Sequence, residues 1–418
     1  MIGMSGLRVI GSAMRHRNYA IITWTMVPSL VTTWMYRVAV GWLAWKLTGS
    51  PTWLGIIAFA DLAPGVLISP FAGALIDRID PMRPMIITQI IIVFQAVALW
   101  AFTISGVITI EILIGLVLLM GLNNPFSTAA RMSVIPRCVP REDLTAAIAF
   151  NSTLFHGSRF IGPAIAGILL LADEGVAFIF ALNAVGYLIL AIGLMRMDLA
   201  PPDLPPRERG NLLSDIADGY RYVATHPGIG PILVLLTLSS VATRPVIDLM
   251  PAFAGDVFHR GADGLAWLTS AVGFGAMVGA YWLAQRGPVV GLTRVVVANI
   301  LFIGLTLLAF TATDIFWLAL LFLAGAGFAM ITSGVGTQTL LQSAVEESMR
   351  GRVMSLYSVI YRGVPAIGAV LMGWLAERFG LQLTLGAGAV ICLMAWVWAT
   401  RRTRTMAPAL EGDQPSAR

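Results

Sequence analysis

Long apolar runs with almost no charged side chains recur along the whole chain, for example Ile86–Ser105 and Leu381–Ala399. A helix needs about 20 apolar residues to cross a hydrocarbon core about 30 Å thick. The runs therefore predict membrane-spanning helices, and turns rich in Gly, Pro and Asp separate them. We predict twelve spans, at residues 20–47, 52–76, 84–105, 109–134, 144–171, 175–196, 229–253, 265–285, 292–311, 315–341, 353–376 and 380–400.

The composition excludes the other broad classes of protein. Hydrophobic residues make up 57% of the 418 residues and charged residues only 12%, whereas soluble domains carry about 25% charged residues. So few charges cannot cover a water-exposed surface, and a disordered chain would be far less hydrophobic. Outer-membrane barrels show short alternating segments, which differ from these continuous runs. We therefore expect an all-α membrane protein.

The distribution of basic residues predicts the orientation in the membrane. If both termini are cytoplasmic, only Lys46, Arg260 and Arg378 fall in the outer loops. Cytoplasmic loops of membrane proteins carry an excess of Lys and Arg. We therefore expect cytoplasmic termini, and we interpret the net charge of +5 as a result of topology rather than of nucleic-acid binding. Four arginines remain inside the predicted spans: Arg37, Arg159, Arg244 and Arg362.

The chain changes character once, in the segment 198–228. Residues 201–209 are too rich in proline and charge to span a membrane, and they indicate a cytoplasmic linker. Residues 211–225 follow with one apolar side, which predicts a short surface helix. The predicted organisation is a six-helix bundle at 1–197, the linker with its helix at 198–228, a second six-helix bundle at 229–402 and a cytoplasmic tail at 403–418.

Weak internal repeats relate the two predicted halves. Arg159 precedes a Gly-Pro pair in span five, and Arg362 precedes a Val-Pro pair in span eleven. Trp53 and Trp267 each stand near the start of a span, the second and the eighth. Repeats of this kind, together with six spans on either side of a linker, are typical of many secondary transporters.

Residues 73–78, with the sequence Gly-Ala-Leu-Ile-Asp-Arg, and Arg83 form the turn between spans two and three. This turn resembles the signature loop of the major facilitator superfamily. Further stretches resemble the branch with the enterobactin exporter and macrolide efflux proteins: residues 33–39 with 47–51, 130–131 with 135–136 and 139–144, 159–163, and 350–355. The resemblance covers essentially the whole chain. It implies the fold of that superfamily, with twelve transmembrane helices in two pseudo-symmetric six-helix bundles, in the bacterial inner membrane.

Charged residues inside spans are costly, by at least about 2.5–3.5 kcal/mol each, and so demand a partner, water or a function. Arg37 and Asp61 stand at equal distances before and after Gly49, in the turn between the first two spans. Antiparallel helices would therefore place them at equal depth. Asp61 would bind a proton under the influence of Arg37, or the two side chains would form a fixed ion pair between the helices.

Two further sets of charges lie in the other spans. Arg244 and Asp248 are four residues apart, on one face of span seven, where they would serve transport or form an internal ion pair. Arg159 and Arg362 have no acidic residue within four positions. These two arginines would attract anionic or carbonyl-rich substrates, or they would bind carbonyl groups freed by the nearby prolines. The candidates for substrate or proton coupling are Arg37, Asp61, Arg159, Arg244, Asp248 and Arg362.

The superfamily resemblance also implies a gate on the cytoplasmic side. Asp77 and the loop arginines Arg78 and Arg83 would lock the two halves in the outward-open state, with Asp77 facing the start of span eleven. Gly73 would let the helices approach closely, and Arg131 would be a further partner. The alternative is a solvated turn that contributes only to topology.

The sequence contains no enzyme signature. Lys46 is the only lysine, which excludes a nucleotide-binding loop of the usual type, and the four His are scattered. We therefore expect no metal or other cofactor. We predict a monomeric secondary active transporter that works by alternating access and exports a small amphipathic molecule, drug-like or siderophore-like, in exchange for protons. The alternatives are an importer or uniporter of a small organic solute and, with less support, a polytopic membrane enzyme.

Overall fold

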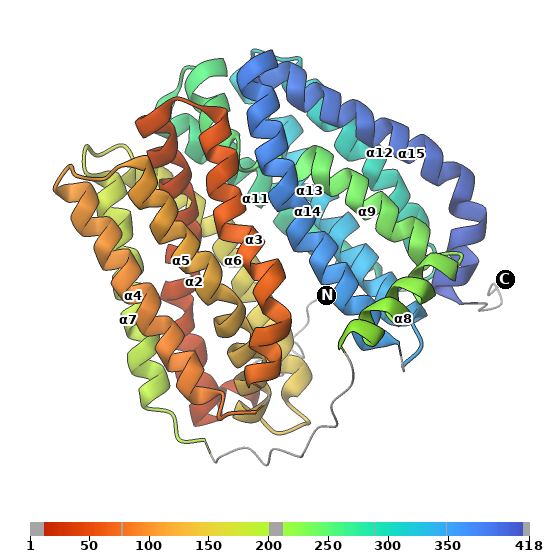
Figure 1. Cartoon of the computed structure of the whole chain (residues 1–418), viewed down its shortest axis with the longest axis horizontal. Coiled ribbons are helices and arrows are strands. Elements are labelled where there is room, and N and C mark those ends of the chain that lie inside the picture. Colours follow the sequence, from red (N-terminus) through yellow and green to blue (C-terminus); the bar gives the residue numbers. More distant parts are fainter. Residues whose placement is uncertain (1–11, 77, 200–211, 288, 348, 413–418) are drawn as a thin grey trace. The chain divides into compact units, whose positions relative to one another are not determined.

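The computed structural model describes residues 12–76, 78–199, 212–287, 289–347 and 349–412. These residues form a succession of long helices (Figure 1). The first half contains α2 (Arg17–Thr48), α3 (Pro51–Ile76), α4 (Met82–Ile104), α5 (Ile110–Val134), α6 (Leu144–Leu169) and α7 (Gly175–Met195). The second half contains α8 (Leu212–Thr225), α9 (Ile229–Thr243), α11 (Gly261–Arg286), α12 (Leu292–Thr311), α13 (Phe316–Ala344), α14 (Arg350–Phe379) and α15 (Leu381–Glu411).

Ten helices in the described part of the chain are long and apolar enough to cross a membrane. The all-α membrane class predicted from the apolar runs is thus confirmed. Helices α2 and α6, which correspond to predicted spans one and five, are not among the ten. Both are long enough, but polar side chains interrupt them, including Arg37 in α2 and Arg159 in α6. The two helices that depart most from a uniform apolar pattern therefore carry candidate site residues.

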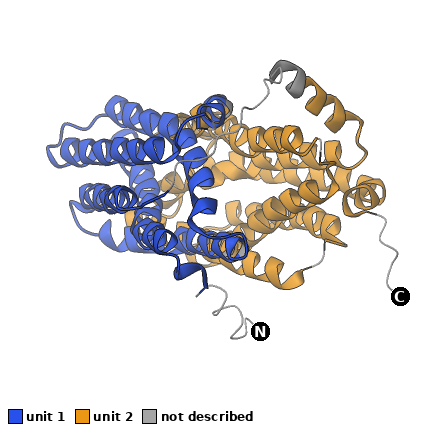
Figure 2. Cartoon of the chain, turned by 90° about the horizontal axis from the view of Figure 1, so that it is seen from below, with its two compact units in different colours: residues 1–48, 67–206 blue, residues 49–66, 207–418 orange. Residues whose placement is uncertain are grey.

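The chain divides into two compact units (Figure 2). Unit 1 comprises Met1–Thr48 and Leu67–Pro206, and unit 2 comprises Gly49–Val66 and Arg207–Arg418. The boundary at Pro206 falls inside the predicted linker, of which residues 200–211 lie outside the described part. Helix α3 contributes its first part to unit 2 and its second part to unit 1. The pairing of two pseudo-symmetric six-helix bundles stays a prediction.

Unit 1 is built around α2 and α7. Helix α2 packs against α6 and α7, and α4 packs against α5 and α7. One buried cluster of unit 1 includes Tyr19, Ile22, Met85 and Val134. The Tyr19 hydroxyl group donates a hydrogen bond to the carbonyl oxygen of Ala147 at 2.9 Å, which joins the beginnings of α2 and α6. This packing holds α2 and α6 at a fixed spacing, on which the first site depends.

Unit 2 is built from α9 and α11–α15. Helix α11 packs against α13, α12 packs against α13 and α15, and α9 packs against α14 and α15. The first part of α3 joins this unit at the far end of α14. There, Ser50 donates a hydrogen bond from Oγ to Oε2 of Glu377 at 2.8 Å. Helix α14 is therefore held by partners from both halves of the sequence.

The segment predicted as a tail is folded over most of its described length. Helix α15 continues to Glu411, and Met406 and Leu410 are 0% and 1% exposed. Both side chains belong to a buried cluster that also includes Val223 of α8. The Glu411 carboxylate accepts hydrogen bonds from the backbone N–H groups of Gly291 and Thr293, at 2.6 and 2.8 Å. A carboxylate at this position satisfies free N–H groups at the beginning of α12.

Helix α8 confirms the short helix predicted after the linker. It packs against α14, where Nη1 of Arg352 lies 3.9 Å from Oδ2 of Asp218. An exposed pair at this distance contributes little to stability. Burial of the neighbouring Val223, which is 8% exposed, contributes more to holding α8 on unit 2.

Candidate functional site

The first cluster of candidate residues surrounds Trp34 in unit 1. The guanidinium carbon of Arg37, on α2, lies 5.5 Å from the centre of the Trp34 ring, and that of Arg159, on α6, lies 5.2 Å from it. Phe155, one turn before Arg159, packs edge-on against the same indole at 5.8 Å. Trp34 and Arg37 are three residues apart on one helix, a spacing that places them on one face. The structure thus brings two of the predicted arginines to one aromatic ring.

This arrangement partly compensates for two like charges inside a membrane protein. The face of an indole ring carries partial negative charge and attracts a guanidinium group within about 6 Å. Such contacts contribute about 0.5–2 kcal/mol each, which is less than the cost of a charge in hydrocarbon. Arg37 is nevertheless exposed in the structure.

The second cluster begins where α9 ends. The predicted span 229–253 is not one regular helix, because α9 stops at Thr243 and a short 3₁₀ turn, η2 (Arg244–Val246), follows. Pro245 has no N–H group to continue the α-helical pattern. After Pro245 the chain passes through the single turn α10 (Met250–Ala252) and the π-helical turn η3 (Phe253–Val257). The prediction that Arg244 and Asp248 lie on one face of a regular helix is therefore wrong.

Arg244 instead makes its main contacts with a tyrosine of α14. Its Nη1 donates a hydrogen bond to the Tyr361 hydroxyl oxygen at 3.3 Å, and its guanidinium carbon lies 4.7 Å from the centre of that ring. Tyr357 stacks on Tyr361 with ring centres 5.5 Å apart, and its hydroxyl group donates to the Gly334 carbonyl oxygen at 3.4 Å. Asp248 also acts on Arg244 electrostatically.

The other two coupling candidates are Arg362, which acts electrostatically on Tyr357 of the second cluster, and Asp61. Arg362 is exposed on α14 and forms no hydrogen bond or ion pair with another described residue. Asp61 is partly exposed on the part of α3 that belongs to unit 2, whereas Arg37 belongs to unit 1. The pairing of Arg37 with Asp61 stays a prediction, as does a proton-binding role for either aspartate.

The predicted gate residues lie at one end of unit 1. Arg78 is exposed in the turn after α3, Arg83 is exposed in the first turn of α4, and Arg131 lies in the last turn of α5. Asp77 lies outside the described residues. At Gly73, a Cβ atom would meet no atom within 4 Å. The close helix approach expected at Gly73 and the gating role both stay predictions.

The aromatic members of both clusters were absent from the predicted site. Trp34 stands three residues before Arg37, Tyr361 directly precedes Arg362, and Tyr357 stands four residues before Tyr361. An aromatic residue at helical spacing from a charged residue inside a span is therefore the sequence signal that could identify these residues. In unit 2, however, the contact runs from Tyr361 to Arg244, which is distant in sequence, and only the fold brings these residues together.

Comparisons with known proteins agree with this architecture. The family described as transmembrane secretion effectors matches residues 11–417. Macrolide efflux protein A of Streptococcus pyogenes is 24% identical over 87% of this chain and 91% of its own length. The enterobactin exporter EntS of Escherichia coli is 31% identical over a match that covers 62% of each chain.

Solved structures with low sequence identity show the same fold. A bacterial homologue of the human lysosomal transporter Spinster superposes with a TM-score of 0.74 at 13% identity, covering 95% of this chain and 99% of that one. A D-xylose–proton symporter superposes with a TM-score of 0.69 at 13% identity, covering 91% and 97%. These proteins are transporters, and so are the relatives matched by sequence. The chain is thus a membrane transporter rather than an enzyme, and it belongs to the transmembrane secretion effector family of the major facilitator superfamily.

Proposed function

We propose that this transporter exports a small amphipathic molecule by alternating access, in exchange for protons. The relatives named for macrolide efflux and enterobactin export support the direction and the class of substrate. The contact of Arg37 and Arg159 with the Trp34 ring is the observation that carries the proposal. A substrate with both an apolar ring system and carbonyl or anionic groups could bind the aromatic and the cationic parts of this cluster together.

Proton coupling would require a carboxyl group whose affinity for protons changes during the cycle. Asp61 and Asp248 are the candidates, because each lies in a predicted span together with arginines. A nearby guanidinium group lowers the proton affinity of a carboxylate, and its withdrawal raises that affinity. For Asp248, the arginine is Arg244, whose guanidinium group contacts the hydroxyl group and the ring of Tyr361. Movement of Arg244 between Tyr361 and Asp248 would change the proton affinity of Asp248.

Substrate transport and its coupling to protons can both be tested in proteoliposomes. We would reconstitute the protein and measure the uptake of a labelled macrolide and of enterobactin into vesicles with an acidic lumen. Proton exchange predicts accumulation in the lumen above the outside concentration, abolished by an ionophore that dissipates the pH gradient. Equilibration without accumulation would support a uniporter, and accumulation driven by an alkaline lumen would support a symporter. Either result would contradict exchange.

Single substitutions would identify the proton-binding carboxylate. Asp61→Asn and Asp248→Asn each remove one titratable group with little change of shape. The variant that still equilibrates substrate but no longer concentrates it carries the coupling proton. If both variants concentrate substrate as the unmodified protein does, the assignment of coupling to these residues is wrong.

The gate belongs to the same proposal. Asp77, Arg78, Arg83 and Arg131 would close the cytoplasmic side of the transporter, which would lie in the bacterial inner membrane with both termini in the cytoplasm. We expect Asp77→Asn to slow transport severely while the amount of protein inserted in the membrane is unchanged. Normal transport by this variant would remove Asp77 from the mechanism.

A further inference from the structure

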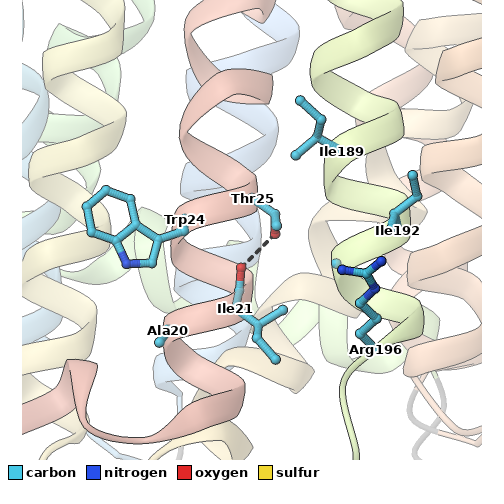
Figure 3. Close-up of a pocket in the computed structure, with 8 residues that line it drawn as sticks. Ala20, Ile21, Trp24, Thr25, Ile189, Ile192 and Arg196 are labelled. Carbon is cyan, nitrogen blue, oxygen red and sulfur yellow. Dashed lines mark hydrogen bonds between the residues drawn. The ribbon is translucent and has the colours of Figure 1, made fainter.

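A groove between α2 and α7 lies at the end of unit 1 where α2 begins and α7 ends (Figure 3). Its volume is about 430 Å³. Two helices supply the lining: Ala20, Ile21, Trp24 and Thr25 from α2, and Ile189, Ile192, Gly193 and Arg196 from α7. None of these residues belongs to the clusters around Trp34 and Arg244. The groove is therefore a separate feature of the molecule.

The floor of the groove is narrow and apolar. Gly193 allows α2 to approach α7 so closely that a Cβ atom there would lie 2.5 Å from Cγ2 of Thr25. The Thr25 hydroxyl group donates its proton to the carbonyl oxygen of Ile21 on its own helix, at 2.7 Å. Ile189 and Ile192 form one wall and are about 40% exposed. An alkyl chain could lie along such a surface and cover these apolar groups.

One charged side chain lines the groove. The Arg196 side chain extends along α7 toward Ile192, so that its guanidinium group lies beside the apolar wall (Figure 3). Arg196 is exposed and forms no ion pair with a carboxylate of another described residue. On α2, the Trp24 side chain is 68% exposed and points away from α7 (Figure 3). Exposed tryptophans at the ends of spanning helices lie at the level of lipid headgroups.

The combination of these groups indicates a lipid. An apolar groove favours a hydrocarbon chain, and a guanidinium group that forms no ion pair with the described residues favours a phosphate, which it can bind through two hydrogen bonds. The predicted topology places this end of α2 and α7 at the cytoplasmic leaflet, where anionic lipids attract basic residues. A free phosphate ion would satisfy Arg196 but would leave the apolar walls uncovered.

We propose that the groove between α2 and α7 binds an anionic phospholipid of the cytoplasmic leaflet, with an acyl chain against Ile189 and Ile192 and the phosphate on Arg196. Trp24, at the edge of the groove on α2, lies at the headgroup level of that leaflet. This site is independent of the proposed transport substrate and of proton coupling.

Native mass spectrometry of the purified full-length protein tests the proposal. We would add phosphatidylglycerol, or phosphatidylcholine as a zwitterionic control, to protein in detergent and count the retained lipids. Arg196→Gln should weaken phosphatidylglycerol binding about ten-fold, the equivalent of one lost charge-assisted hydrogen bond. The matched control Arg141→Gln, which removes another exposed arginine of unit 1, should bind as the unmodified protein does. Equal retention by the Arg196→Gln variant would overturn the proposal.

Fluorescence would locate the lipid. The chain has 12 Trp, so the contribution of Trp24 is obtained by comparing the unmodified protein with a Trp24→Phe variant. Phosphatidylglycerol with brominated acyl chains should quench the Trp24 component, and phosphatidylcholine with the same chains should quench it less. Inorganic phosphate should not displace the lipid at equal concentration. Equal quenching by both lipids, or displacement by phosphate alone, would contradict a site that recognises the whole lipid.

Discussion

At the scale of single residues, each cluster combines an arginine with an aromatic ring. Trp34 contacts Arg37 and Arg159, and Tyr361 contacts Arg244. A ring face offers a cation partial negative charge, and it holds a guanidinium group less strongly than a carboxylate does.

The contact between Arg244 and Tyr361 predicts a graded response to substitution. Tyr361→Phe removes the hydroxyl group and keeps the ring, so we expect unfolding to become easier by about 1 kcal/mol. Tyr361→Ala also removes the ring contact with Arg244 and the stacking on Tyr357, with an expected loss above about 2 kcal/mol. Denaturant unfolding of the purified protein in detergent measures both values. Equal effects of the two variants would show that the ring contributes nothing.

Asp143 predicts a dependence of stability on pH outside the membrane. Hydrogen bonds from Ser12, at 2.6 Å, and from His16, at 2.7 Å, hold the pKa of Asp143 below its ordinary value of 3.8. The folded state therefore favours the charged carboxylate. The resulting stabilisation is present above pH 3.8 and is lost as the pH falls through the lower pKa of the folded state.

The measurement is the midpoint of thermal unfolding across this pH range. On acidification from pH 5, the unmodified protein should lose more thermal stability than Asp143→Asn, which cannot titrate at this position. The Ser12→Ala variant should show an intermediate dependence because it removes the larger of the two causes. An identical pH profile for the unmodified protein and Asp143→Asn would contradict this role.

At the scale of elements, the contact between α11 and α13 shows how glycines let two helices pack backbone against backbone. A Cβ atom on Gly275 of α11 would collide with the backbone of Ala324, and one on Gly327 of α13 would collide with the backbone of Val272. Each helix thus presents a glycine to the backbone of the other. Membrane helices gain stability from such close packing because lipid provides no hydrophobic drive between them.

This packing predicts that Gly275→Val prevents normal folding of unit 2. The added side chain would have to displace backbone atoms of α13, which are less adaptable than a flexible side chain. We expect a large loss of monodisperse protein after detergent extraction, measured by size-exclusion chromatography. Gly115→Val is the matched control, because nothing lies within 4 Å of a Cβ atom at Gly115 on α5. Equal recovery of the two variants would show that the α11–α13 contact tolerates separation.

At the scale of the whole molecule, the positions of basic residues predict the topology. A fluorescent protein fused after Arg418 should fluoresce, because the C-terminus is expected in the cytoplasm. Alkaline phosphatase fused at the same point should be inactive, whereas a fusion after Gly106, between α4 and α5, should be active. The opposite pattern would invert the orientation and would place the groove near Arg196 in the outer leaflet.

Most of the architecture could be predicted from the sequence because the membrane imposes it. Every predicted span except the seventh corresponds to one helix near the expected position, since a backbone in hydrocarbon must satisfy its own hydrogen bonds. In span seven, Pro245 interrupts the helix, although the apolar run is continuous in the sequence. The segment beyond residue 402 also differs from the predicted tail, because it continues α15 and packs against unit 2. Two apolar residues, Met406 and Leu410, were too few to indicate a packed helix in the sequence.

The sequence by itself determined that this chain is a helical membrane protein, which of its charges lie inside spans and which family it resembles. These properties depend on composition and local order. Only the tertiary structure decided which aromatic ring each arginine meets, as with Arg244 and Tyr361, and that α2 and α7 form a groove beside Arg196. Contacts of this kind depend on the rotation and spacing of helices distant in sequence, which are set by small residues such as Gly193 at their crossing points.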